Sequence, residues 1–124
     1  MEKYRLIKVE ETHDDVRCVR LRKPRMEELE VYQMADELTD LVVKQGCRKM
    51  ALSLGPEAPD CMYSVFLAKL IMVQRNLHER GGEMLLCEVG PVTQTIFQAC
   101  RLDAQFHFVT DFTAALARWG GQPQ

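Results

Sequence analysis

Five cysteines are the most reactive side chains of this sequence, and none has the spacing of a metal site or a disulfide framework. They are Cys18, Cys47, Cys61, Cys87 and Cys100, an odd number that contains no Cys-x-x-Cys pair. Zinc knuckles need closer pairs. The sequence therefore predicts no metal and no other cofactor, and it predicts thiols that pack as small apolar groups. Cys61 lies in an expected loop, so a thiol enzyme or small-ligand binder that uses Cys61 stays an alternative.

Histidines and glycines offer no catalytic arrangement either. His13, His78 and His107 are far apart in the sequence, and no nucleophile stands beside one of them. A glycine-rich phosphate loop is also missing, because Gly81-Gly82 stands alone after an expected helix. We therefore assign no catalytic residue and expect a protein that is not an enzyme.

Length and charge indicate one soluble unit. The 124 residues fit a single domain, which we place at 1–119 with a polar tail at 120–124. A net charge of −2 gives no field that favours nucleic acid or anionic lipid. The first five residues lack the apolar core of a signal peptide, and the apolar stretch near 65–73 is too short to span a bilayer. We expect a cytoplasmic protein without nucleic-acid or membrane partners.

The elements that must position any site follow from hydrophobic periodicity. Alternating residues at 6–10 and 16–21 around a polar turn predict a β-hairpin. Helical spacing then runs over about 26–45, with Glu37 and Asp40 among the polar positions and Gly46 as the stop. The remaining expected elements are a strand at 49–54, a helix capped by Asp60 or a neighbour, a strand at 83–89, a helix opened by Gly90-Pro91, a strand at 106–109 and a helix capped by Asp111. This order predicts an α/β fold: a mixed sheet, an opening hairpin, and about four flanking helices.

Three consecutive segments of this sequence resemble the STAS domain of anti-sigma factor antagonists. Residues 77–91 (LHERGGEMLLCEVGP) are similar to a family segment in which two glycines lead into a buried strand and a proline. Residues 92–103 are similar to the helix that follows, and 106–116 to the family's ending. The resemblance covers about Val16 to Trp119 and is strongest from Leu67 onward. It implies a STAS-like sheet flanked by helices.

The resemblance also implies a function and a site. Family members bind protein partners: serine kinases that act as anti-sigma factors, phosphatases, or larger scaffolds. In the best-known members a serine or threonine at the start of the second helix is phosphorylated, and this controls release of the partner. Here Ser64 matches the first hydroxyl position of that motif, whereas Val65 stands where the phosphorylated residue usually lies. The motif's acid and glycine are absent, and Phe66 replaces the glycine, so we expect the fold and the binding surface without the phospho-switch.

The loop before this helix is about two residues longer than usual, which leaves Cys61, Met62 and Tyr63 as alternative matches to the motif. Methionine and tyrosine are frequent in interface cores. We therefore expect a partner-binding surface at the start of the second helix, made of Pro59, Asp60, Cys61, Met62, Tyr63 and Phe66. An equally weighted alternative is that Met62 and Phe66 fold back onto the sheet. A non-phosphorylated structural or oligomeric scaffold, including a homodimer, also stays open.

Overall fold

Within residues 3–120, which the computed structural model describes, five strands and four helices follow the order β-β-α-β-α-β-α-β-α predicted above. Met1, Glu2 and the predicted tail from residue 121 onward lie outside the described residues. The elements are β1 (Ile7–His13), β2 (Val16–Leu21), α1 (Glu28–Val43), β3 (Lys49–Ser53), α2 (Tyr63–Glu79), β4 (Glu83–Cys87), α3 (Pro91–Ala99), β5 (His107–Val109) and α4 (Phe112–Arg118).

The strands form one mixed sheet in the spatial order β1-β2-β3-β4-β5. β1 and β2 are antiparallel, as a hairpin requires, while β2, β3, β4 and β5 run parallel to one another. Each parallel connection passes through a helix, because parallel neighbours need a crossover. The predicted α/β class and mixed sheet are therefore confirmed.

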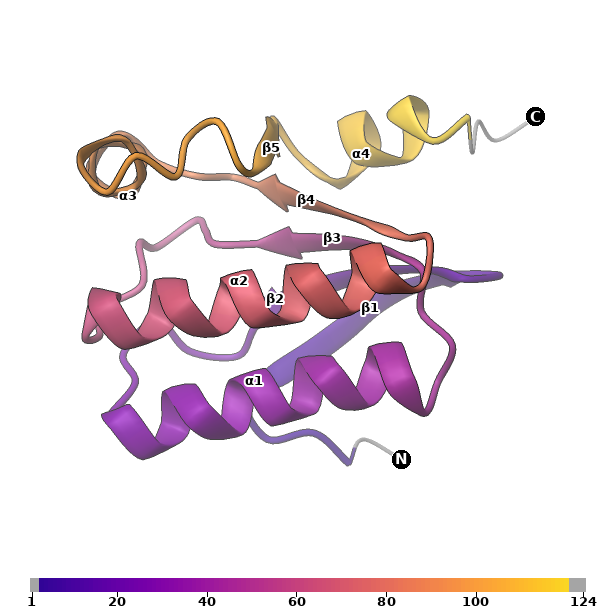
Figure 1. Cartoon of the computed structure of the whole chain (residues 1–124), viewed down its shortest axis with the longest axis horizontal. Helices are drawn as coiled ribbons and strands as arrows, with labels where there is room; N and C mark the ends of the chain where they lie inside the picture. The colour runs from indigo at the N-terminus through magenta and orange to yellow at the C-terminus, as the bar shows by residue number, and fades with distance from the viewer. Residues whose placement is uncertain (1–2, 121–124) are drawn as a thin grey trace.

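Helices cover the two faces of the sheet unequally. α1 and α2 lie side by side across one face, and both begin at the edge where the parallel strands end, on the left of Figure 1. The main core lies under these two helices and includes Met34, Leu38, Leu70 and Leu86. α4 covers part of the other face, where its buried Ala115 packs in a smaller cluster with residues of β2, β3 and β4. Because β2, β3, β4 and β5 run parallel, the loops that follow them lie at one edge of the sheet.

Cysteine burial agrees with the expectation of apolar packing for most of the thiols. Cys18, Cys47 and Cys87 are buried, Cys61 is half-buried and Cys100 is exposed, and all five are free. Burial raises the pKa of the Cys87 thiol to about 12, so this group stays protonated and inert.

The ends of the elements show where local sequence signals hold and where they fail. Gly46 has the expected left-handed backbone, and the Asp111 carboxylate accepts a hydrogen bond of 2.9 Å from the amide of Ala114 at the start of α4. The sequence predicts that Asp60 or a neighbour caps α2; the cap lies at a neighbour, and the predicted side-chain hydrogen bond is not made. The N-cap residue is Met62, which offers no side-chain hydrogen bond, and Asp60 instead pairs through its backbone with the loop before α1.

α1 is two residues shorter at each end than predicted.

No helix within residues 3–120 is both long enough and apolar enough to cross a membrane.

Candidate docking surface

Two loops meet at the edge where the parallel strands end, and backbone hydrogen bonds join them. The amide of Asp60 donates to the carbonyl of Pro24 (2.8 Å), and the amide of Met26 donates to the carbonyl of Asp60 (3.1 Å). Arg25 and Asp60 thereby form an isolated parallel bridge. Because the loop after β2 leads into α1 and the loop after β3 leads into α2, these bonds fix the starts of the two helices beside each other.

Residues 60–64, which we call the docking turn, lie at the surface. Met62 is 54% exposed, so about half of this apolar side chain is accessible to solvent. Asp60 and Ser64 are exposed as well, and Cys61 and Tyr63 are half-buried. The turn thus presents an apolar tip with one acid and one hydroxyl beside it, all from the segment that the sequence singles out.

Phe66 and Pro59 do not belong to the exposed surface. Phe66 has no exposed area and packs edge-on against Tyr63, with ring centroids 5.7 Å apart. Pro59 is buried as well. The predicted contact of these two residues with a partner stays a prediction. Neither is exposed in this structure, and Phe66 lies on the helix face that also carries Leu70 and Val73. For Phe66, the alternative that the ring folds back onto the sheet holds, whereas Met62 points outward.

Tyr63 connects the docking turn to α3. Its hydroxyl donates to the carbonyl of Pro59 (2.7 Å) and lies 3.3 Å from the hydroxyl oxygen of Thr93, which is buried. The sequence gives no sign of this contact, since 30 residues separate the partners. Tyr63 therefore links the docking turn to Pro59 and to α3, while part of its side chain stays exposed.

Two further apolar side chains are exposed at the same edge, and sequence reasoning missed both. Leu29 in the first turn of α1 is 76% exposed, and Val92 in the first turn of α3 is 68% exposed. The exposure of Leu29 could have been found from helix geometry. Leu29 lies two residues before Val31, the first buried residue of α1, and residues two apart on a helix point in different directions. With Met62 at the N-cap of α2, an exposed apolar residue stands at the start of each of the helices α1, α2 and α3.

A charged cluster holds the loop that leads into the turn. One guanidinium nitrogen of Arg20 donates to a carboxylate oxygen of Glu88 (2.6 Å) and to the carbonyl of Gly55 (3.0 Å), and Arg20 also pairs with Glu10 (3.0 Å). The Ser53 hydroxyl donates to Glu88 (2.5 Å), and this bond together with Arg20 lowers the pKa of the Glu88 carboxyl. The cluster ties β1, β2, the end of β3 and the residue after β4 to one another.

Glycine is required where this loop crosses the turn after β4. A Cβ atom at Gly55 would lie 2.4 Å from the carbonyl oxygen of Glu88, closer than real Cβ contacts approach. Glu88 itself has a left-handed backbone with φ of 56°. The start of the loop is therefore fixed by direct contact between two backbone segments.

Cys61 has poor properties for thiol chemistry. Burial, with a smaller contribution from the charge of Asp60, raises its pKa to about 11. The nucleophilic form is the thiolate, which is then scarce at neutral pH. This weakens the alternative of a thiol enzyme. Among the described residues, groups of three or more His, Cys, Asp or Glu that could hold a metal ion are also absent.

Comparisons with known proteins define the fold. Neither a family model nor a curated protein matches the chain. Solved structures do match over nearly its whole length. A STAS domain protein from Planctomyces limnophilus, described as an anti-sigma factor antagonist, is 24% identical, with a TM-score of 0.71 over 90% of this chain and 96% of that one.

Two more solved structures lead to the same conclusion. The Bacillus cell fate determinant SpoIIAA in its phosphorylated form is 17% identical, with a TM-score of 0.68 over 91% of this chain and 98% of that one. An anti-sigma factor antagonist from Mycobacterium paratuberculosis is 19% identical, with a TM-score of 0.71 over 90% of this chain and 92% of that one. The chain has the STAS fold, and the predicted resemblance to STAS domains of anti-sigma factor antagonists is confirmed at the level of the fold.

Proposed function

We propose that this chain, as one domain over residues 1–119, is a regulatory protein-binding module of the cytoplasm rather than an enzyme. Its partner is a serine-kinase anti-sigma factor, a phosphatase or a larger scaffold, and it docks through the start of α2. The STAS fold supports this proposal, since the matched structures include anti-sigma factor antagonists.

The observation that carries the proposal is an exposed apolar turn on a fixed frame. Met62 projects from residues whose backbone is bonded to the neighbouring loop at Asp60, and buried Phe66 anchors the helix directly behind it. A preordered turn loses little conformational entropy on binding. Methionine adapts its shape to a partner's surface, and interface cores are enriched in it. The turn therefore has the composition and the support of a contact site.

Substitution of Met62 tests this proposal. Met62→Asp is expected to weaken binding to the purified partner at least about tenfold, because it places a charge in the centre of the contact. The measurement is calorimetric titration with the serine kinase, phosphatase or scaffold encoded beside the gene. Met72→Asp is the matched control, since Met72 is an exposed methionine of the same helix but ten residues further along.

Unchanged affinity in Met62→Asp, with both variants folded, would remove the docking turn as the contact site. Equal losses in Met62→Asp and Met72→Asp would point to the outer face of α2 instead. If every candidate partner fails to bind and the chain self-associates, the oligomeric scaffold becomes the better reading.

We also propose that docking proceeds without a phospho-switch. Val65 stands at the position expected for the phosphorylated residue, and a valine cannot accept a phosphate. The sequence holds two serines, of which Ser53 is fully buried and Ser64 is exposed at the second position of α2. Incubation with the partner kinase and ATP is expected to leave both serines unmodified when the chain is analysed by intact-mass spectrometry.

A mass increase of one phosphate that disappears in Ser64→Ala would contradict this expectation. Ser64 would then be the switch, because a phosphate in the first helical turn adds about 1.5 to 2 negative charges to the docking turn.

A further inference from the structure

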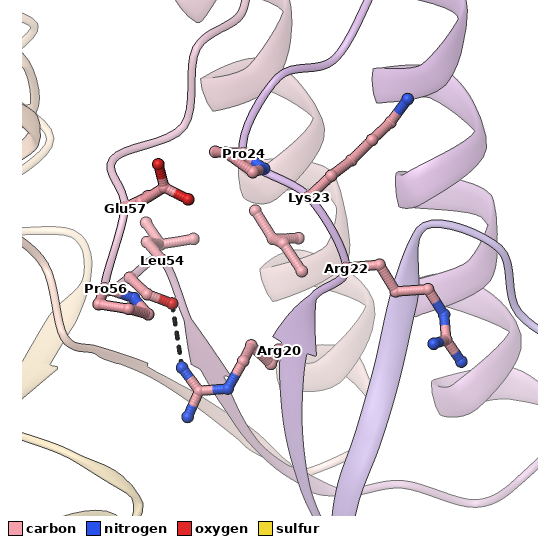
Figure 2. Close-up of a pocket in the computed structure, with 9 residues that line it drawn as sticks. Arg20, Arg22, Lys23, Pro24, Leu54, Pro56 and Glu57 are labelled. Atoms are coloured by element: carbon pink, nitrogen blue, oxygen red, sulfur yellow. Dashed lines mark hydrogen bonds between the residues drawn. The ribbon is translucent and has the colours of Figure 1, made fainter.

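A small pocket opens beside the docking turn, between the loop after β2 and the loop after β3 (Figure 2). Its volume is about 200 Å³. The lining residues come from two segments of the chain, 20–24 and 54–57. The carbonyl of Pro24, which belongs to the wall, accepts the hydrogen bond from Asp60, so the pocket adjoins the docking turn.

The size and the walls of the pocket favour a single side chain as its occupant. Pockets for small molecules and cofactors measure roughly 300 to 1,000 Å³, which is larger than this one. Pro24, Leu54 and Pro56 are apolar residues of the lining, and Leu54 is almost completely buried. An aliphatic chain that enters from a partner would fill such a space.

The cations that line the pocket are already neutralised or directed elsewhere. Arg20 pairs with Glu88 and Glu10, and its guanidinium donates to the Gly55 carbonyl, the bond drawn in Figure 2. Lys23 pairs with Glu30 at 2.6 Å. Figure 2 shows the side chains of Lys23 and Arg22 extending away from the space between Pro24 and Pro56. A partner's anion would therefore find little unopposed positive charge.

Glu57 is the charged residue of the pocket that has no oppositely charged partner within residues 3–120. Its side chain is exposed at the pocket, and it makes no hydrogen bond or ion pair with any residue of 3–120. A carboxylate next to apolar walls is complementary to a side chain with an aliphatic stem and a cationic head. Arginine and lysine have that form.

We propose that this pocket takes an arginine or lysine side chain of the protein partner, with its head on Glu57 and its stem against Pro24, Leu54 and Pro56. This inference rests on the proposed function, because it assumes that the occupant belongs to a protein partner. It adds the chemistry of recognition: a basic residue on the partner next to the surface that meets Met62.

The pocket can be tested without the partner, by NMR titration of the ¹⁵N-labelled chain with N-acetyl-arginine amide. The expected result is saturable movement of the Leu54, Gly55 and Glu57 amide signals, with an affinity in the millimolar range appropriate to one side chain. The neutral analogue N-acetyl-citrulline amide should bind at least about fivefold more weakly. Glu57→Gln should remove the difference in affinity between the two probes. Glu79→Gln should keep that difference, since Glu79 is an exposed acid at the far end of α2.

Equal binding of the arginine and citrulline probes by the unaltered chain would overturn the proposal, as would shifts that avoid the pocket. Stronger binding of N-acetyl-glutamate amide or inorganic phosphate would make the pocket an anion site instead.

Binding to the partner then separates this inference from the proposed function. Glu57→Lys is expected to weaken partner binding at least about tenfold, with a smaller loss at high salt, since an exposed ion pair is screened. If Met62→Asp weakens binding and Glu57→Lys leaves it unchanged, the pocket proposal fails and the docking turn stands. If the arginine probe binds but Met62→Asp has no effect on the partner, the docking turn fails and the basic-side-chain pocket stands.

Discussion

Replacing Phe66 with alanine is expected to lower the free energy of unfolding by about 3 to 5 kcal/mol. Phe66 is among the largest side chains without any exposed area, and it contacts the ring of Tyr63 at the start of α2. Truncation removes buried apolar surface and leaves a cavity behind the docking turn. Urea unfolding followed by circular dichroism measures the change.

Met62→Ala is the matched control for Phe66→Ala, since it truncates a large apolar residue four positions earlier. Because Met62 is mostly exposed, the free energy of unfolding of the Met62→Ala variant should stay within about 0.5 kcal/mol of that of the unaltered chain. A Phe66→Ala variant as stable as the unaltered chain would show that Phe66 lies outside the core. Loss of partner binding in that stable variant would restore Phe66 as a direct contact.

Replacing Glu37 with alanine is expected to cost about 2 to 4 kcal/mol, because its carboxylate satisfies buried backbone donors. Glu37 lies on α1 and is only 8% exposed. Its two oxygens accept hydrogen bonds from the amides of Arg5 (2.9 Å), Leu6 (2.9 Å) and Ile7 (3.1 Å). Without the carboxylate, these donors lose their partner where the chain enters β1.

Asp36→Ala serves as the comparison for Glu37→Ala, since Asp36 is the neighbouring acid on the exposed side of α1. Thermal or urea unfolding should separate the two variants clearly. Hydrogen exchange adds a local readout: the amides of Arg5, Leu6 and Ile7 should exchange faster in Glu37→Ala alone. Equal stability of the two variants, or unchanged exchange at these three amides, would contradict the role given to Glu37.

The order of elements was predictable because each element has its own local periodicity. Buried runs such as 83–87 and the helical spacing in 28–43 identify their elements without any knowledge of neighbours. The burial of Phe66 was also predictable in principle, since Phe66, Leu70, Val73 and Leu77 follow one helix face. Met62 leaves that face because its backbone is still extended, with ψ of 102°, and the helix has not begun.

The remaining features depend on contacts between distant segments. Arg20 and Glu88 are 68 residues apart, and Glu37 meets residues 5–7 about 30 positions away. In the sequence Glu37 resembles any other acid on the polar side of a helix, so its burial has no local sign. The pocket at Glu57 has the same origin, because it exists only where the loops after β2 and β3 meet.

The loop before α2 is fixed at both of its ends, and this limits how its length can vary. Gly55 is pressed against the backbone of Glu88, and Asp60 is tied to the backbone of Pro24. Between these anchors lie three exposed residues, 56–58. Insertions or deletions that preserve the direction of α2 are therefore confined to these three positions, where extra chain can bulge into solvent without shifting Met62.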